Sequence, residues 1–166
     1  MAILTNSARI VLAQYILTCP IFLAIGEGKQ SWDSNPDGVP DPPDYDAVGL
    51  IKTLGWKKLT RSFFVVQDDD GDIDMPGGLK YKQSNIPTRD IYMHFVFNYG
   101  EGEKQTIREA GVFINTQVNL GLPSKQTYFK PEEISRQGTL LLLEHLDDPD
   151  NFTPNKKGSY GTILTI

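Results

Sequence analysis

Near its middle the chain reads Thr106-Ile107-Arg108-Glu109-Ala110-Gly111-Val112-Phe113. This segment follows a long alternating stretch, Ile91–Tyr99, and a short polar turn that begins at Gly100. A polar loop, rather than a helix, comes after it. Side chains alternate between the two faces of a strand, so the odd-numbered residues from Ile91 to Tyr99 are expected on one face. The two segments therefore predict an antiparallel hairpin within a β protein.

A helix is predicted ahead of the first strand. Thr5, Asn6 and Ser7 carry side chains that cap helices, because their oxygens accept hydrogen bonds from free backbone N–H groups. Pro20 ends this helix, and the buried strand Ile21–Ile25 follows. The apolar residues that recur at helical spacing are Ala8, Val11, Leu12, Tyr15 and Ile16.

The rest of the chain alternates between apolar segments and turns. Further strands are expected at Lys57–Gln67, Leu79–Gln83, Thr139–Leu143 and Tyr160–Ile166. Long loops are expected at 29–46, 116–137 and 147–158, and the first of them is acidic and rich in proline. This order predicts a mainly β protein: an antiparallel β-sandwich with an N-terminal α-helix and long irregular loops. The length of 166 residues fits a single structural domain, 1–166, in which 147–166 form a C-terminal extension and strand.

Composition excludes several classes of protein. The net charge of −5 argues against a general nucleic-acid surface, and a single cysteine, Cys19, excludes an internal disulfide. The apolar stretch Ile10–Ile25 imitates a signal peptide, but only Arg9 precedes it and Gln14 interrupts it. It is also too short and too mixed for a membrane span. We therefore expect neither nucleic acid nor membrane as a partner, and we interpret the stretch as a buried helix that runs into a buried strand.

The first long loop contains a pattern that resembles a calcium site. Oxygen-bearing side chains stand at loop positions 1, 3, 5, 9 and 12 around a glycine at position 6, namely Asp33, Asn35, Asp37, Asp41 and Asp44. Against calcium, prolines fill several of the remaining positions, and the last ligand is Asp rather than the longer Glu. The alternatives are a bound calcium ion and a solvated acidic loop. No other cofactor is expected.

No pattern in the sequence predicts a catalytic site. The serines lack a nucleophile motif, and Gly26-x-Gly28 lacks the third glycine of a dinucleotide-binding loop. Glu144 and His145 are neighbours in an apolar strand, which does not make them a catalytic pair. We therefore expect that the protein is not an enzyme.

Arg108 and Glu109 are unusual within an apolar strand. Adjacent strand residues point to opposite faces, so one of the two faces the core or an inter-element groove. One alternative is an exposed position on an edge strand. The other is a paired charge that holds the sheet against another element or a neighbouring subunit.

Four segments together resemble a known class of phage protein. They are Leu4–Ala8 at the start of a helix, Leu23–Gly28 before a loop with tryptophan and proline, Thr106–Phe113, and Gly138–Glu144. Their order and spacing are similar to small tail-associated virion proteins of tailed phages, and to the N-terminal module of tail-collar and tail-fibre proteins. The resemblance implies a structural protein of the virion, in the tail, neck or baseplate, with no catalytic or cofactor residues. It also implies that the chain assembles with copies of itself and with neighbouring tail components.

Large amphipathic side chains are the expected interface contacts, since they bury much area at low entropic cost. We predict an interface at Trp32, Arg108, Glu109, Tyr128, Phe129 and Tyr160. The C-terminal strand that carries Tyr160 is a candidate to add to a neighbour's sheet edge. The alternative functions are a calcium-dependent β-sandwich that binds carbohydrate or a surface, and a small hydrolase.

Overall fold

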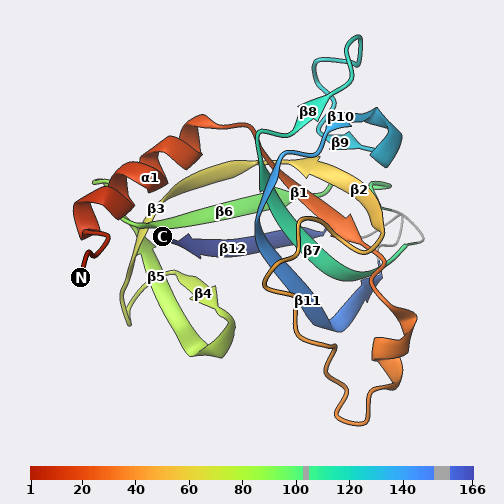
Figure 1. Ribbon diagram of the computed structural model, residues 1–166, viewed down its shortest axis with the longest axis horizontal. Coiled ribbons are helices and arrows are strands. Elements are labelled where there is room, and N and C mark those ends of the chain that lie inside the picture. The colour runs from red at the N-terminus through yellow and green to blue at the C-terminus, as the bar shows by residue number, and fades with distance from the viewer. Residues whose placement is uncertain (103–104, 152–157) are drawn as a thin grey trace. The chain divides into compact units, whose positions relative to one another are not determined.

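The computed structural model describes residues 1–102, 105–151 and 158–166 (Figure 1). By its internal contacts the chain falls into two compact units. The first comprises Met1–Cys19, Thr60–Phe95 and Tyr160–Ile166, and the second comprises Pro20–Leu59 and Val96–Ser159. Each is described by itself, and the single domain expected from the sequence stays a prediction.

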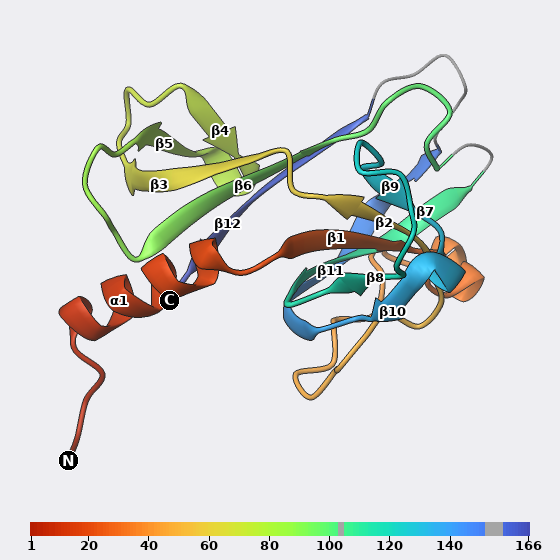
Figure 2. The same cartoon turned by 90° about the horizontal axis from the view of Figure 1, so that it is seen from above.

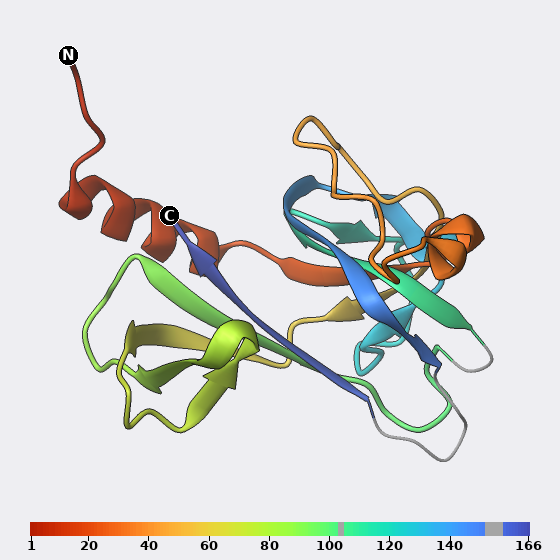
Figure 3. The same cartoon turned by 90° about the horizontal axis from the view of Figure 1, so that it is seen from below.

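The first unit contains the helix and a five-stranded sheet. Helix α1 spans Asn6–Thr18, and the sheet has the strand order β12-β6-β3-β5-β4. These strands are β3 (Arg61–Gln67), β4 (Ile73–Met75), β5 (Leu79–Gln83), β6 (Asp90–Val96) and β12 (Ser159–Thr165). Figures 2 and 3 show α1 beside the C-terminal end of β12, which is the outermost strand on that side of the sheet.

Helix α1 begins as the sequence predicts. Thr5 is the N-cap, and its Oγ1 accepts a hydrogen bond of 3.2 Å from the backbone N–H of Ala8. The expectation that the whole helix is buried is wrong, because only Ala13 and Ile16 are buried whereas Val11, Leu12 and Tyr15 are exposed. One face of the helix meets its own unit, and nothing in the described chain covers the rest.

Strand β6 shows the predicted alternation. Ile91, Met93 and Phe95 are buried, and the residues between them are half-buried. On the opposite face the ring of Tyr92 stacks on His94, at 6.0 Å between centroids. Burial and then the charge of Arg61 lower the pKa of His94, whose Nδ1 accepts a bond from Arg61. This histidine is therefore satisfied on the sheet surface.

The second unit is built on the other five-stranded sheet, of order β11-β7-β1-β2-β9. Its strands are β1 (Ile21–Gly26), β2 (Thr53–Lys58), β7 (Thr106–Ile114), β9 (Tyr128–Phe129) and β11 (Thr139–Asn151). All its pairings are antiparallel, and β1 lies between β2 and β7. Each residue of β1 is buried, which confirms the predicted buried strand.

The predicted hairpin is wrong, although both of its strands exist. Strand β7 pairs with β1 and β11, whereas β6 pairs with β3 and has β12 as its other neighbour. The predicted strand Lys57–Gln67 is likewise two strands in different sheets, divided at Leu59 and Thr60. Strand β11 runs to Asn151, past the predicted end at Leu143. Residues 103–104 of the predicted turn and 152–157 of the predicted last loop lie outside the described part of the chain.

The predicted loop at 116–137 contains short regular elements instead. They are β8 (Gln117–Val118), β9, the 3-10 helix η3 (Pro131–Glu133) and β10 (Ile134–Arg136). Val118 of β8 and Ile134 of β10 pack on a buried cluster from the main sheet, made by Phe22, Ala24, Trp56, Phe113 and Phe129. A two-stranded sheet thus covers one face of the larger sheet. This sandwich-like arrangement confirms a mainly β, antiparallel fold with one N-terminal helix.

Candidate functional site

The site is built around Arg108 and Glu109, which occupy neighbouring positions on β7 and are both buried, with exposed fractions of 7% and 0%. Arg108 grips the carboxylate of Asp33 with two hydrogen bonds, Nε to Oδ1 at 2.7 Å and Nη2 to Oδ2 at 2.6 Å. Its Nη1 also donates to the backbone carbonyl of Glu27 at 3.2 Å. The hydrogen bonds from Arg108 lower the pKa of Asp33, and the same bonds raise the pKa of Arg108. This paired charge fastens the 3-10 helix η1 (Gln30–Ser34) to the strand.

Glu109 points to the other face of β7 and acts as an acceptor for backbone groups. Its Oε1 accepts from the N–H groups of Gly28 and Lys52, and its Oε2 accepts from Ile51 N–H, at 3.2–3.3 Å. Gly26 gives it room, because a Cβ on that residue would lie 2.4 Å from Oε1. The carboxylate therefore ties together the two ends of the segment between β1 and β2.

Trp32 fixes the same segment at a third point. The ring is buried on His145 of β11, at 4.3 Å between centroids, and its Nε1–H donates to Asp41 Oδ2 at 3.1 Å. His145 Nδ1 lies 2.6 Å from the backbone oxygen of Asp41, a hydrogen bond when that nitrogen carries the proton. Gly28 adopts φ of +59°, and a Cβ there would lie 2.5 Å from the indole ring.

These anchors leave the middle of the segment on the surface. We name residues 36–51 the display loop; most of it projects from the sheet in all three views (Figures 1–3), whereas Pro40 is buried and Leu50 packs against the buried cluster. Tyr45 is 101% exposed and Val48 is 78% exposed, and Val39 and Ile51 are exposed as well. Asp37, Asp44 and Asp46 are also exposed, so the loop presents apolar side chains among carboxylates.

The calcium pattern is not assembled by the loop. Asp33 is engaged by Arg108, and Asp41 accepts from Trp32. Asp37 and Asp44 accept from backbone N–H groups two residues further on, and the Asn35 amide donates to Val39 C=O. Among the described residues, no group of three or more His, Cys, Asp or Glu is placed to hold a metal ion. Calcium therefore gains no geometric support and stays an untested prediction.

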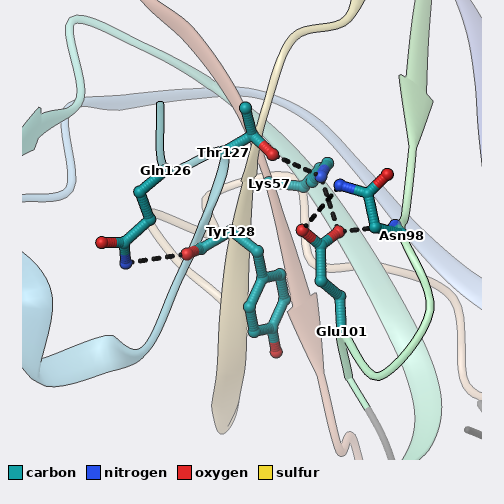
Figure 4. A network of polar contacts seen from close by, with 6 residues as sticks. All are labelled: Lys57, Asn98, Glu101, Gln126, Thr127 and Tyr128. Atoms are coloured by element: carbon teal, nitrogen blue, oxygen red, sulfur yellow. Dashed lines mark hydrogen bonds and ion pairs between the residues drawn. The ribbon is translucent and has the colours of Figure 1, made fainter. Parts of the chain in front are cut away.

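A second polar network lies on the same unit (Figure 4). Lys57 of β2 is 2% exposed, and its Nζ donates to Glu101 Oε2 at 2.6 Å and to Thr127 Oγ1 at 2.8 Å. Glu101 in turn accepts from the backbone and side-chain nitrogens of Asn98. The network joins the turn after Phe97 to β2 and to the segment before β9. It is a structural clamp, because each charge has a partner.

Tyr128 lies beside this clamp. Burial, and then the negative charge of Glu101, raise the pKa of Tyr128 to about 12. Its ring meets Phe97 edge-on, at 6.2 Å between centroids, and covers Gly55, where a Cβ would lie 2.0 Å from the hydroxyl. The neighbouring Phe129 belongs to the buried cluster.

The structure thus brings together only some of the residues predicted as interface contacts. Trp32, Arg108 and Glu109 act inside the chain as anchors, and Phe129 is a core residue. Tyr160 is half-buried, with its ring 6.4 Å from that of Phe95. The interface role of these residues stays a prediction. The pairing of Lys57 with Glu101 could not be predicted from local patterns, because it spans 44 positions.

Comparison with known proteins identifies the family. A family model described as "Baseplate wedge 3 tail fiber network component" matches residues 1–166. The chain belongs to this family. This baseplate family places the chain in the phage virion, as a tail-associated structural component. No curated protein matches the chain, and the predicted similarity to tail-collar proteins stays a prediction.

The baseplate assignment fits the character of the site. The groups on β7 hold the ends of the segment between β1 and β2 in place, and Tyr45 and Val48 between them are exposed. None of the helices in the described ranges is long and apolar enough to cross a bilayer.

Proposed function

We propose that this baseplate component is an assembly subunit without catalytic function, which docks onto neighbouring proteins of the tail fiber network through the display loop. The family supports a structural role, since it is defined by a place in the baseplate. The observation that carries the proposal is the difference in burial between the two ends and the centre of the segment that joins β1 to β2. Its base is held by buried Arg108, Glu109 and Trp32, whereas Tyr45 and Val48 at its centre contact water.

Rigid anchoring is what a docking loop requires. A loop that is already ordered loses less conformational entropy on binding, so more of the contact energy appears as affinity. Tyr45 is suited to be the central contact, because tyrosine contributes large apolar area with few rotatable bonds. Asp44 and Asp46 on either side favour a partner with an apolar pocket rimmed by basic residues.

The proposal is tested by reconstitution with the other baseplate and tail-fibre proteins of the same phage. Wild-type chain and a Tyr45→Ala, Val48→Ala double variant are each mixed with those proteins, and the assemblies are separated by sedimentation. We expect the double variant to stay out of the assembly although its melting temperature is unchanged. The matched control is Leu120→Ala, since Leu120 is 100% exposed outside the display loop. Full incorporation of the double variant would overturn the proposal.

A further inference from the structure

The edges of the sheets are protected unequally. Strands β4 and β9 are only three and two residues long, and Pro76 and Lys130-Pro131 follow them. Strand β11 is long but carries Glu144, Asp147 and Asp148, and its pairing is interrupted by two register shifts. Short length, charge, proline and irregularity are the features that keep sheet edges from pairing with other chains.

Strand β12 has none of these protections. Its seven residues, Ser-Tyr-Gly-Thr-Ile-Leu-Thr from Ser159 to Thr165, include no charge and no proline. It is the outermost strand beside β6 (Figure 3), and no described strand pairs with its other side. Such an edge exposes a row of N–H and C=O groups that only another extended strand can satisfy together.

The backbone groups that face outward can be identified. At one end of β12, Gly158 C=O accepts from Phe97 N–H, and at the other end Ile166 N–H donates to Arg89 C=O. Both groups of one residue point to the same side, and the side alternates along a strand. Even-numbered residues therefore bond to β6. The outward groups belong to Ser159, Gly161, Ile163 and Thr165.

We propose that β12 pairs antiparallel with β12 of a second copy of this chain, about a two-fold axis at Thr162. This register places Gly161 opposite Ile163 and Ser159 opposite Thr165, so all four outward residues form hydrogen-bonded pairs. No like charges meet, because neither strand carries any. Among the described strands, the edges β4, β9 and β11 are guarded, and β8 and β10 are only two and three residues long. The matching edge is therefore β12 of a second copy, and the contact closes as a dimer instead of extending into a fibre.

This pairing deepens the proposed function, because it supplies the contact between copies while the display loop supplies the contact to other proteins. Ile163→Pro removes an outward N–H and leaves the bonds to β6 intact, and proline is tolerated on an edge strand. Because the dimer is two-fold symmetric, each substitution removes two hydrogen bonds between the copies. We expect the dimer dissociation constant to rise by about tenfold or more. Ile163→Val keeps the N–H and serves as the matched control.

Sedimentation equilibrium over a range of concentrations gives the test. We expect wild type and Ile163→Val to reach twice the chain mass of 18.6 kDa, and Ile163→Pro to remain at that mass with a native circular dichroism spectrum. A wild-type chain that is monomeric throughout overturns the pairing, and so does a dimer that Ile163→Pro leaves intact but Val11→Lys on α1 dissolves. A monomer that still enters assemblies through Tyr45 overturns the pairing alone and leaves the proposed function standing.

A positive test does not depend on the fold tolerating proline. In a Cys19→Ser background, Thr162→Cys places two thiols across the axis, at the short spacing of a non-hydrogen-bonded pair. Mild oxidation should convert most of the chain to a disulfide-linked dimer. Ser159→Cys, which faces residue 165 in this register, is the control and should link far less. Equal linking of the two variants would contradict the register.

Discussion

Glu109 shows how one buried side chain sets the path of a long segment. Three backbone N–H groups, from Gly28, Ile51 and Lys52, have this carboxylate as their acceptor. A buried N–H without an acceptor costs about 1–3 kcal/mol, so the carboxylate stabilises the segment by satisfying all three. On the opposite face, Arg108 holds the same segment by a second contact, because its guanidinium donates two hydrogen bonds to the carboxylate of Asp33.

Replacing Glu109 with glutamine tests this role at constant shape. The amide nitrogen would face backbone N–H donors, and the charge-assisted bonds would become neutral ones. We expect Glu109→Gln to lower the free energy of unfolding by about 2–4 kcal/mol in urea denaturation. Glu132→Gln, at an exposed residue of η3, is the control and should change it by less than about 0.5 kcal/mol. Equal effects of the two would contradict the anchor.

The raised pKa of Tyr128 leads to a prediction about stability at high pH. The folded side chain has a pKa of about 12, against 10.0 for an ordinary tyrosine. Between these values the unfolded chain binds fewer protons than the folded chain, so the free energy of unfolding falls as pH rises through this range. Ultraviolet titration of the folded protein should show a tyrosinate that forms at about pH 12, and Tyr128→Phe should remove this step. A wild-type titration in which every tyrosine ionises near its ordinary pKa would refute the burial argument.

The sequence revealed part of this residue-scale picture. Adjacent charges in an apolar strand indicated that Arg108 or Glu109 faces inward, and the paired-charge alternative is what the structure shows. Their partners could not be derived, because Asp33 lies 75 positions from Arg108 and local patterns carry no information on such contacts. For the same reason Trp32 was predicted as a surface contact although it is a buried anchor.

At the scale of elements, the segment between β1 and β2 has two kinds of residue that can be tested separately: buried residues that hold it in place, such as Trp32, and exposed residues, such as Tyr45. Trp32→Ala removes the ring between Asp41 and His145, and we expect a loss of about 3 kcal/mol in unfolding free energy and faster hydrogen exchange across residues 33–41. Tyr45→Ala removes a side chain that touches only water and should change the stability by less than about 0.5 kcal/mol. The two are compared by denaturation and by hydrogen exchange. A Tyr45→Ala variant as unstable as Trp32→Ala would mean that the loop is packed, not displayed.

The acidic loop gives a prediction on metal removal. The oxygens of Asp33 and Asp41 are engaged with Arg108 and Trp32, and no three acidic side chains of the described loop converge. We therefore expect the same melting temperature with excess calcium and with a chelator, within about 1 °C, since binding to the folded state alone would raise it. A large rise with calcium would restore the calcium-dependent module as an alternative.

Strands were easier to predict than their partners. The period of two located β6 and β7, and the capping residues located α1, because both signals are local. The hairpin was wrong because the pairing of β7 with β1 and β11 depends on contacts across the whole chain. The residues that divide β2 from β3, Leu59 and Thr60, carry no glycine or proline signal, which is why one long strand was expected there.

At the scale of the whole molecule, the chain is a baseplate component with surfaces that its own fold does not use. Apolar residues of α1, the side chains of the display loop and the open edge of β12 are all exposed in a single copy. A subunit that acts alone has no need of such features, and large exposed apolar groups mark interaction sites. The family's place in a tail fiber network gives these surfaces a context.

The most direct test compares the free chain with the chain in the intact virion. Hydroxyl-radical footprinting labels side chains in proportion to their contact with water and is read out by mass spectrometry. We predict that Tyr45 and Val48 are strongly labelled in the free chain and protected in purified virions, whereas buried Trp32 is weakly labelled in both. Equal labelling of Tyr45 in the two states would contradict docking through the display loop.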